Sequence, residues 1–138
     1  MTIEDPLLAA LADAAQRKMR ADYQIRLLLA YAREHVQPRP YRLADLADAA
    51  KRKEQANHQI RLLLAYAREH VQPRPYRLAD LAQAVGMSIS GIRTAYTQAD
   101  IDQAAALTGG TRSRHLLAVI VSLLVNGHSA RERHGTAV

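Results

Sequence analysis

The stretch YRLADLAQAVGMSISGIRTAYT, residues Tyr76–Thr97, decides how the rest of the chain is organised. An apolar, alanine-rich segment that contains Leu78 and Leu81 runs into Gly86, and a second segment begins at Ser88. Gly86 stands where the chain must reverse, a place that favours a positive φ and therefore glycine. Ser88 is a suitable N-cap, because its hydroxyl can accept a hydrogen bond from an amide of the first helical turn. The stretch therefore predicts two short helices joined by a tight turn.

The two faces of this helix pair are predicted from the spacing of its apolar residues. The residues expected to be buried between the helices are Leu81, Val85, Met87, Ile92 and Ala95. Ala82 is small enough for the second helix to cross the first closely. Short polar groups and one arginine remain outside, and such a surface suits a helix that enters a DNA major groove. The residues expected to contact DNA there are Ser88, Ser90, Gly91, Arg93, Thr94 and Thr97.

The segment resembles the helix-turn-helix of bacterial transcription regulators, most closely the kind found in region 4 of sigma factors. The resemblance covers about Gln59–Thr97, since a preceding helix and a proline-containing turn also belong to such domains. It implies that this chain binds double-stranded DNA. Arg74 and Arg77 lie near the start of the first helix, where basic residues commonly meet the DNA backbone. Gly91 lies inside the second predicted helix, where glycine costs roughly 1 kcal/mol of stability relative to Ala. Close approach of this helix to DNA would explain the glycine.

An internal repeat precedes and overlaps this region. The first repeat, Gln24–Ala47, reads QIRLLLAYAREHVQPRPYRLADLA, and the second repeat, Gln59–Ala82, is identical to it. The offset is 59 − 24 = 35 residues, and weaker identity continues upstream, where Leu11–Ala15 resembles Leu46–Ala50. Helical-repeat copies normally diverge outside their packing positions, whereas here the solvent-facing residues match as well. A recent tandem duplication, natural or engineered, explains the identity.

The two repeats lead into different continuations of the chain. The second repeat continues into Gly86 and the predicted reading helix, whereas the first continues into the charged residues Asp48–Glu54. Neither Gly nor Pro occurs between Leu43 and His70, so one helix of about 28 residues and about 42 Å is expected there. An equally unbroken run spans Leu7–Val36. The first repeat thus contains the supporting helix but is not followed by a predicted reading helix.

Both repeats carry an apolar stripe at helical spacing. The stripe of the second repeat is Ile60, Leu63, Leu64, Ala67 and Val71, and it is expected to shield the helix-turn-helix. The corresponding stripe of the first repeat is Ile25, Leu28, Leu29, Ala32 and Val36. The stripe of the first repeat has no reading helix to cover. We expect it to pack against the Leu43–His70 helix, the C-terminal helix or a second chain, with domain exchange as one route.

The C-terminal part predicts two more helices. Gln98–Leu107 reads as a short helix that ends at a double glycine, and Ser113–Val125 reads as an apolar helix closed by Asn126-Gly127. So many apolar residues require burial in the core or in a homodimer. The polar residues 128–138 are expected to be disordered. The predicted units are an N-terminal extension (1–58), a helix-turn-helix domain (59–98), C-terminal helices (99–127) and this tail (128–138).

Composition sets the remaining limits. The chain has 138 residues, no Cys and a formal net charge of +6, with a sequence pI near 10.1. This charge suits a polyanionic partner, and the absence of Cys excludes disulfides and thiolate metal sites. We find no catalytic constellation, cofactor motif, metal-ligand spacing, export signal or membrane span. The sequence therefore predicts an all-α, cytoplasmic DNA-binding regulator that is not an enzyme. The alternative is a helical protein–protein interaction module, such as a partner of a regulator or of RNA polymerase.

Overall fold

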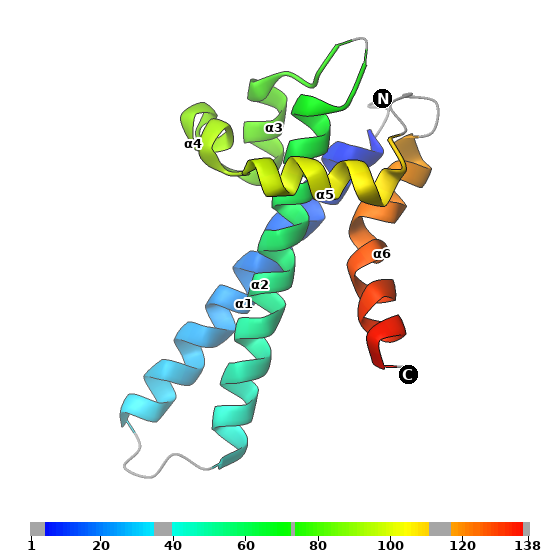
Figure 1. The fold of residues 1–138 in the computed structure, drawn as a ribbon. Coiled ribbons are helices and arrows are strands. Elements are labelled where there is room, and N and C mark those ends of the chain that lie inside the picture. Colours follow the sequence, from blue (N-terminus) through cyan, green and yellow to red (C-terminus); the bar gives the residue numbers. More distant parts are fainter. Residues whose placement is uncertain (1–4, 35–39, 73, 111–116, 137–138) are drawn as a thin grey trace.

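The computed structural model describes residues 5–34, 40–72, 74–110 and 117–136 (Figure 1). Across these residues the regular structure consists of six α-helices and no β-strand, which confirms the all-α prediction. The helices are α1 (Pro6–Glu34), α2 (Pro40–Glu69), α3 (Leu78–Val85), α4 (Ile89–Thr94), α5 (Gln98–Thr108) and α6 (Leu117–Thr136).

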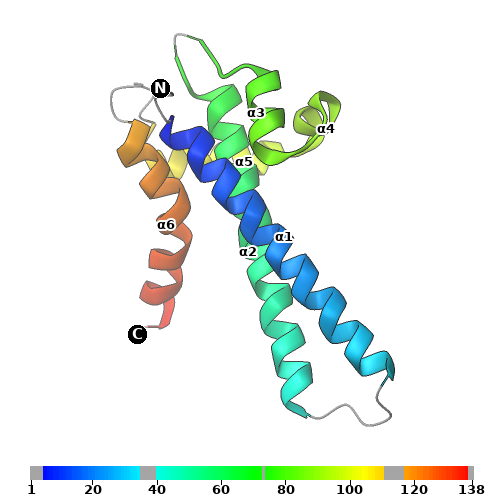
Figure 2. The same ribbon diagram turned by 180° about the vertical axis from the view of Figure 1, so that it is seen from behind.

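The long helices α1 and α2 form an antiparallel pair that dominates the molecule (Figures 1 and 2). Each begins at a proline, Pro6 or Pro40, and proline suits the first helical position because its missing amide has no partner there. Each also has an arginine in its last turn, Arg33 or Arg68, where a positive charge is favourable because of the helix dipole. Both helices are continuous, as the sequence predicted, although α2 begins three residues before Leu43.

The α1–α2 pair has approximate internal two-fold symmetry. Its register is fixed by an ion pair between Asp22 and Lys53 (2.8 Å) and by a hydrogen bond from Arg17 to Gln59. In this register residues 11–15 of α1 lie beside 60–64 of α2, and the related residues 46–50 lie beside 25–29. Small residues at equivalent positions of the two helices are buried where the helices meet. These residues are Ala14 and Ala49, and Ala21 and Ala56.

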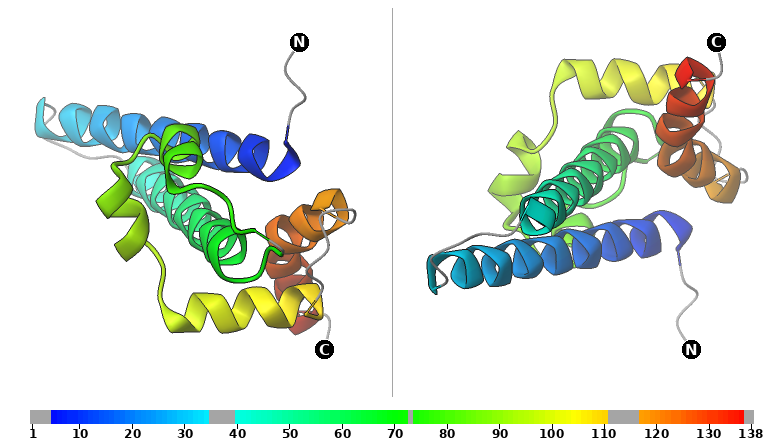
Figure 3. Two further views of the ribbon diagram at one scale, coloured as in Figure 1. Left: turned by 90° about the horizontal axis from the view of Figure 1, so that it is seen from above. Right: turned by 90° about the horizontal axis from the view of Figure 1, so that it is seen from below.

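The remaining helices gather at one end of this pair, around the start of α1 and the end of α2 (Figure 3). The hydrophobic core lies there and draws on all six helices. It includes Leu7, Leu11, Leu62, Leu63, Leu64, Tyr66, Leu81, Ile92, Ala104, Ile120 and Leu124. The apolar stripe of the second repeat is buried throughout, as predicted. The other end of the pair, residues 19–34 and 40–53, projects away from the core, and we call it the arm (Figure 1).

The start of α5 at Gln98 agrees with the sequence prediction, whereas the end of α6 differs from it. Gly109 (φ 63°) ends α5, which confirms that the double glycine is a helix cap. One face of α6, with Leu117, Ile120, Val121 and Leu124, packs on α1, α2 and α5 and is buried within the chain, whereas Val119 and Leu123 are exposed. However, α6 continues to Thr136, so the predicted helix end at Asn126-Gly127 is wrong. A glycine weakens a helix by about 1 kcal/mol but ends it only where the backbone turns left-handed. Ser113 lies outside the described residues.

Candidate nucleic-acid interface

The turn between α3 and α4 has the geometry that the sequence predicted. Gly86 adopts φ 78° and ψ 34°, a left-handed conformation that glycine tolerates best. Its amide donates to the carbonyl of Ala82 (2.8 Å), and the amide of Met87 donates to the same carbonyl (3.0 Å). Both bonds are accepted by one carbonyl in the last turn of α3, and the chain reverses sharply after it. A residue with a Cβ at position 86 would strain this turn.

Ser88 caps the second helix of the pair. Its Oγ accepts a hydrogen bond from the Gly91 amide at 3.0 Å, which confirms the predicted N-cap. The capped helix, α4, has only 6 residues and is therefore about 9 Å long. The sequence predicted a helix that continued to Thr97, so the candidate reading helix is shorter than expected. Few side chains of so short a helix can reach into one DNA groove.

The inner face of α3 and α4 agrees with the prediction except at one residue. Leu81 and Ile92 are fully buried, and Ala82 is buried where the two helices cross. Val85 and Ala95 are half-buried. Met87, however, is 37% exposed and does not join the core, so that prediction is wrong. The left-handed turn at Gly86 directs the chain outward there, and this rotation cannot be read from apolar spacing alone.

The outer face of α4 carries most of the predicted contact residues. Ser90, Arg93 and Thr94 are all exposed, and the Thr94 hydroxyl donates weakly to the Ser90 carbonyl at 3.4 Å. Gly91 is half-buried, and a Cβ added to it would come within 3.1 Å of Ser88 Oγ and 3.2 Å of Met87 Cε. A side chain at position 91 would therefore press on the cap of α4, so contacts within the chain explain the glycine.

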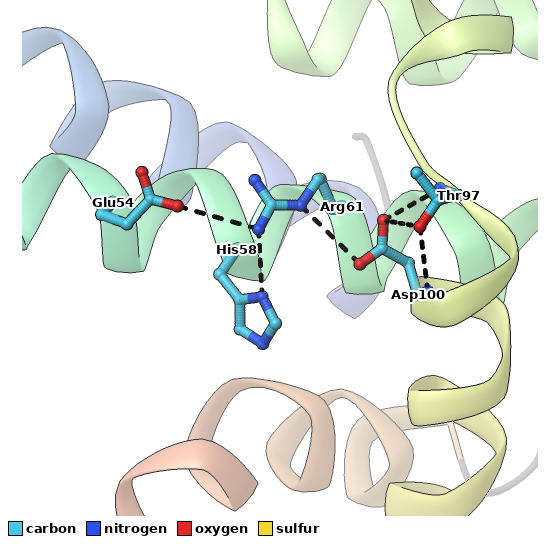
Figure 4. A network of polar contacts seen from close by, with 5 residues as sticks. All are labelled: Glu54, His58, Arg61, Thr97 and Asp100. Atoms are coloured by element: carbon cyan, nitrogen blue, oxygen red, sulfur yellow. Dashed lines mark hydrogen bonds and ion pairs between the residues drawn. The ribbon is translucent and has the colours of Figure 1, made fainter.

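Thr97 does not lie on α4. It is the N-cap of α5, where its amide donates to Asp100 Oδ2 (2.9 Å) and its Oγ1 accepts weakly from the Asp100 amide (3.4 Å). Asp100 is buried, and its Oδ1 lies 3.7 Å from Arg61 Nε on α2 (Figure 4). Arg61 also contacts His58 Nδ1 at 3.3 Å. This network fixes the start of α5 against α2, and it thereby sets where the chain must leave α4.

Arg74 and Arg77 precede α3 in the sequence, and the residues around them differ from those around α4. Both are exposed, and Arg77 is the N-cap residue of α3 without a side-chain cap bond. They line a shallow hollow that also includes Asp5 and Asp80. The Tyr76 hydroxyl between them donates to the Asp5 carboxylate (2.7 Å), which ties this loop to the start of α1. The two arginines thus lie exposed at the N-terminal end of α3, beside the carboxylates of Asp5 and Asp80.

Comparison with protein-family models, with curated proteins and with solved structures finds no match to this chain. Across the described residues, His, Asp and Glu side chains do not form a group of three or more that could hold a metal ion. None of the helices in this part of the chain is long and apolar enough to cross a membrane.

Proposed function

We propose that the chain binds double-stranded DNA through α4 and regulates transcription in a bacterial cytoplasm. The observation that supports this proposal is the geometry from Gly86 to Thr94. A glycine turn and a serine cap set a short helix at the surface, with Ile92 buried and Ser90, Arg93 and Thr94 exposed. A net charge of +6 favours approach to a polyanion.

Each exposed group has a role that suits its chemistry. The Arg93 guanidinium can bind guanine or a phosphate oxygen through two donors. Ser88 and Ser90 can donate to phosphate, and Gly91 keeps the Ser88 cap of α4 free of a side-chain clash. Arg74 and Arg77 would bind phosphates beside α3. Because α4 is so short, it reads few base pairs, and we therefore propose that a homodimer reads two half-sites.

Arg93→Ala is expected to weaken specific DNA binding by about 1–3 kcal/mol without changing the fold. The side chain is exposed, so its removal leaves no buried cavity. Fluorescence anisotropy with a selected duplex gives the affinity, and circular dichroism checks the helices. Arg26→Ala is a matched control, because Arg26 is also exposed but lies on the arm. Equal affinities of the wild type and Arg93→Ala would contradict the assignment.

Arg74→Ala and Arg77→Ala are each expected to weaken binding to all DNA sequences about equally. Each lost phosphate contact should reduce the slope of log affinity against log salt concentration by about one. Affinities for random and selected duplexes are measured over a salt series. A variant that changes sequence preference while keeping the wild-type salt slope would rule out a backbone role for that arginine.

A second candidate function is a helical protein–protein interaction module. The observation in its favour is that Met87 and Ile89, on either side of Ser88, are 37% and 45% exposed. Exposed apolar side chains suit a protein partner better than a phosphate backbone. Binding to random duplex DNA at low salt, followed by selection of an operator from genomic fragments, separates the two functions. A chain that binds neither DNA pool would favour the interaction module.

A further inference from the structure

A cavity of about 620 Å³ lies between α1, α2 and the turn that joins α3 to α4. Its volume is in the range of pockets that bind small organic molecules. Met19 on α1 is 68% exposed and Met87 in the turn is 37% exposed, so both methionines are open to solvent. Methionine side chains are flexible and adapt to the shape of an apolar ligand. The apolar residues that line the cavity are Ala15, Met19, Ile60, Val85, Met87 and Ala95.

The polar lining of the cavity includes one lysine whose charge is not paired. Two other charged side chains of the lining are held in ion pairs, Asp22 with Lys53 (2.8 Å) and Arg61 with Asp100 (3.7 Å). Lys18 is half-buried, and its ammonium makes no hydrogen bond or ion pair with another described residue. Partial burial of a charge without a partner is unfavourable. The cavity therefore has an excess positive charge and suits an anionic group.

The approximate two-fold symmetry of α1 and α2 indicates which group Lys18 lacks. The symmetry relates positions that are 53 − 18 = 57 − 22 = 35 residues apart, so the Asp22–Lys53 ion pair corresponds to Asn57 and Lys18. Position 57 thus holds a neutral amide where position 22 holds a carboxylate. Asn57 is half-buried in the lining of the same cavity, and its side chain has no hydrogen bond to another described residue. On this side of the helix pair the chain supplies the ammonium without the carboxylate.

We propose that the cavity binds a small organic monocarboxylate, with its carboxylate at Lys18 and Asn57 and its apolar body against Met19, Val85 and Met87. The ammonium and the amide both donate hydrogen bonds, and a carboxylate has acceptors for both. Its single negative charge matches one lysine, whereas a phosphate group carries a larger charge at neutral pH and would need a second free cation. The binding requires no DNA, so its failure would leave the proposed DNA binding untouched.

The test uses three ligands that separate the charge from the apolar body, namely octanoate, octanol and acetate. The chain has three methionines, and two of them line the cavity. NMR spectra of the full chain with isotope-labelled methionine methyl groups follow Met19 and Met87 directly, and replacement of each by leucine assigns its signal. Octanoate should shift both signals with one dissociation constant. This constant should be at least roughly tenfold lower than the constants for octanol and acetate, because a charge-assisted hydrogen bond adds to apolar contact.

Two substitutions test the missing carboxylate. Asn57→Asp supplies a carboxylate from the chain itself, so octanoate should then bind no more tightly than octanol. Lys18→Met removes the charge and keeps an unbranched side chain, and it should have the same effect. Octanol should bind both variants as it binds the wild type. Lys51→Met is the matched control, because Lys51 is an exposed lysine of α2 that does not line this cavity. Circular dichroism verifies that all variants are folded.

Three outcomes would overturn the inference. The first is octanoate that leaves the Met19 and Met87 signals in place, or that shifts them with different dissociation constants. The second is binding of octanol or acetate as tight as that of octanoate, which would mean an apolar contact or an ion contact alone. The third is a preference for octanoate over octanol that survives Asn57→Asp and Lys18→Met, or that Lys51→Met abolishes equally.

Discussion

Leu64→Ala is expected to lower the free energy of unfolding by about 2–5 kcal/mol, whereas Leu29→Ala should lower it by about 1 kcal/mol or less. The two leucines occupy the same place in identical sequences, so helix propensity and local contacts cancel in the comparison. Leu64 is fully buried in the core, and its truncation leaves a cavity. Leu29 is 51% exposed on the arm, so solvent fills the space.

Urea denaturation of the wild type and both variants measures this difference, provided that the slopes of the transitions agree. The ratio of the two losses of stability is more informative than either loss alone, because both variants replace a leucine by alanine in the same chain. Equal losses of stability would mean that the arm is packed as tightly as the core. A larger loss for Leu29→Ala would place the covering helices on the first repeat instead.

Deletion of residues 43–77, which joins Arg42 to Leu78, is expected to convert the chain into a dimer that cannot fold as a monomer. The product has 138 − 35 = 103 residues, one repeat and one α3–α4 pair. In the full chain, Leu11 and Ala14 at the start of α1 pack with Leu63 of the second repeat. After deletion the stripe and the start of α1 lie on one helix, about 20 Å apart, so they cannot meet within one molecule. A partner must supply the missing side, and DNA binding should persist with altered half-site spacing.

The midpoint of thermal unfolding of this deletion variant should rise with chain concentration, which distinguishes a folded dimer from a folded monomer. Sedimentation equilibrium gives the stoichiometry, and the full-length chain is the control. If the variant remains unfolded at every concentration, the two repeats form one indivisible core, and the duplication account of this architecture is wrong. A monomer with concentration-independent stability would contradict the packing of α1 on α2.

Local chemistry made part of the fold predictable from the sequence. Gly86 and Ser88 act through their own backbone and side chain, so their roles could be read directly. The unbroken α1 and α2 could be predicted from the absence of Gly and Pro within them. The identical segments 43–47 and 78–82 are both helical, but the former lies near the start of the long α2 and the latter begins the short α3. The residues downstream of each segment, charged in one case and Gly86 in the other, decide the helix length, and they are visible in the sequence.

Other features depend on contacts between distant residues and could not be read in this way. α4 ends at Thr94 because Thr97 and Asp100 cap α5, and Asp100 is held by Arg61 from α2. Apolar spacing alone therefore predicted a second helix that is longer than α4 is in the structure. The clearest case is the contrast between Leu27, which is exposed, and Leu62, which is buried. Because the two leucines stand in identical sequences, local sequence cannot predict this difference in burial. Whether Ser90, Arg93 and Thr94 contact DNA stays a prediction.

The approximate two-fold symmetry of α1 and α2 has a consequence for the origin of the arm. Two single-repeat chains would pair through the same helix contacts only when they met in solution. The duplication tethers the two halves, so that one finds the other at an effective concentration in the millimolar range for a short connection. The α3–α4 pair was not copied with its supporting helix, however. If α4 binds DNA as proposed, the linked pair carries one DNA-binding unit where two separate chains would carry two, and the gain is a pairing that does not depend on chain concentration.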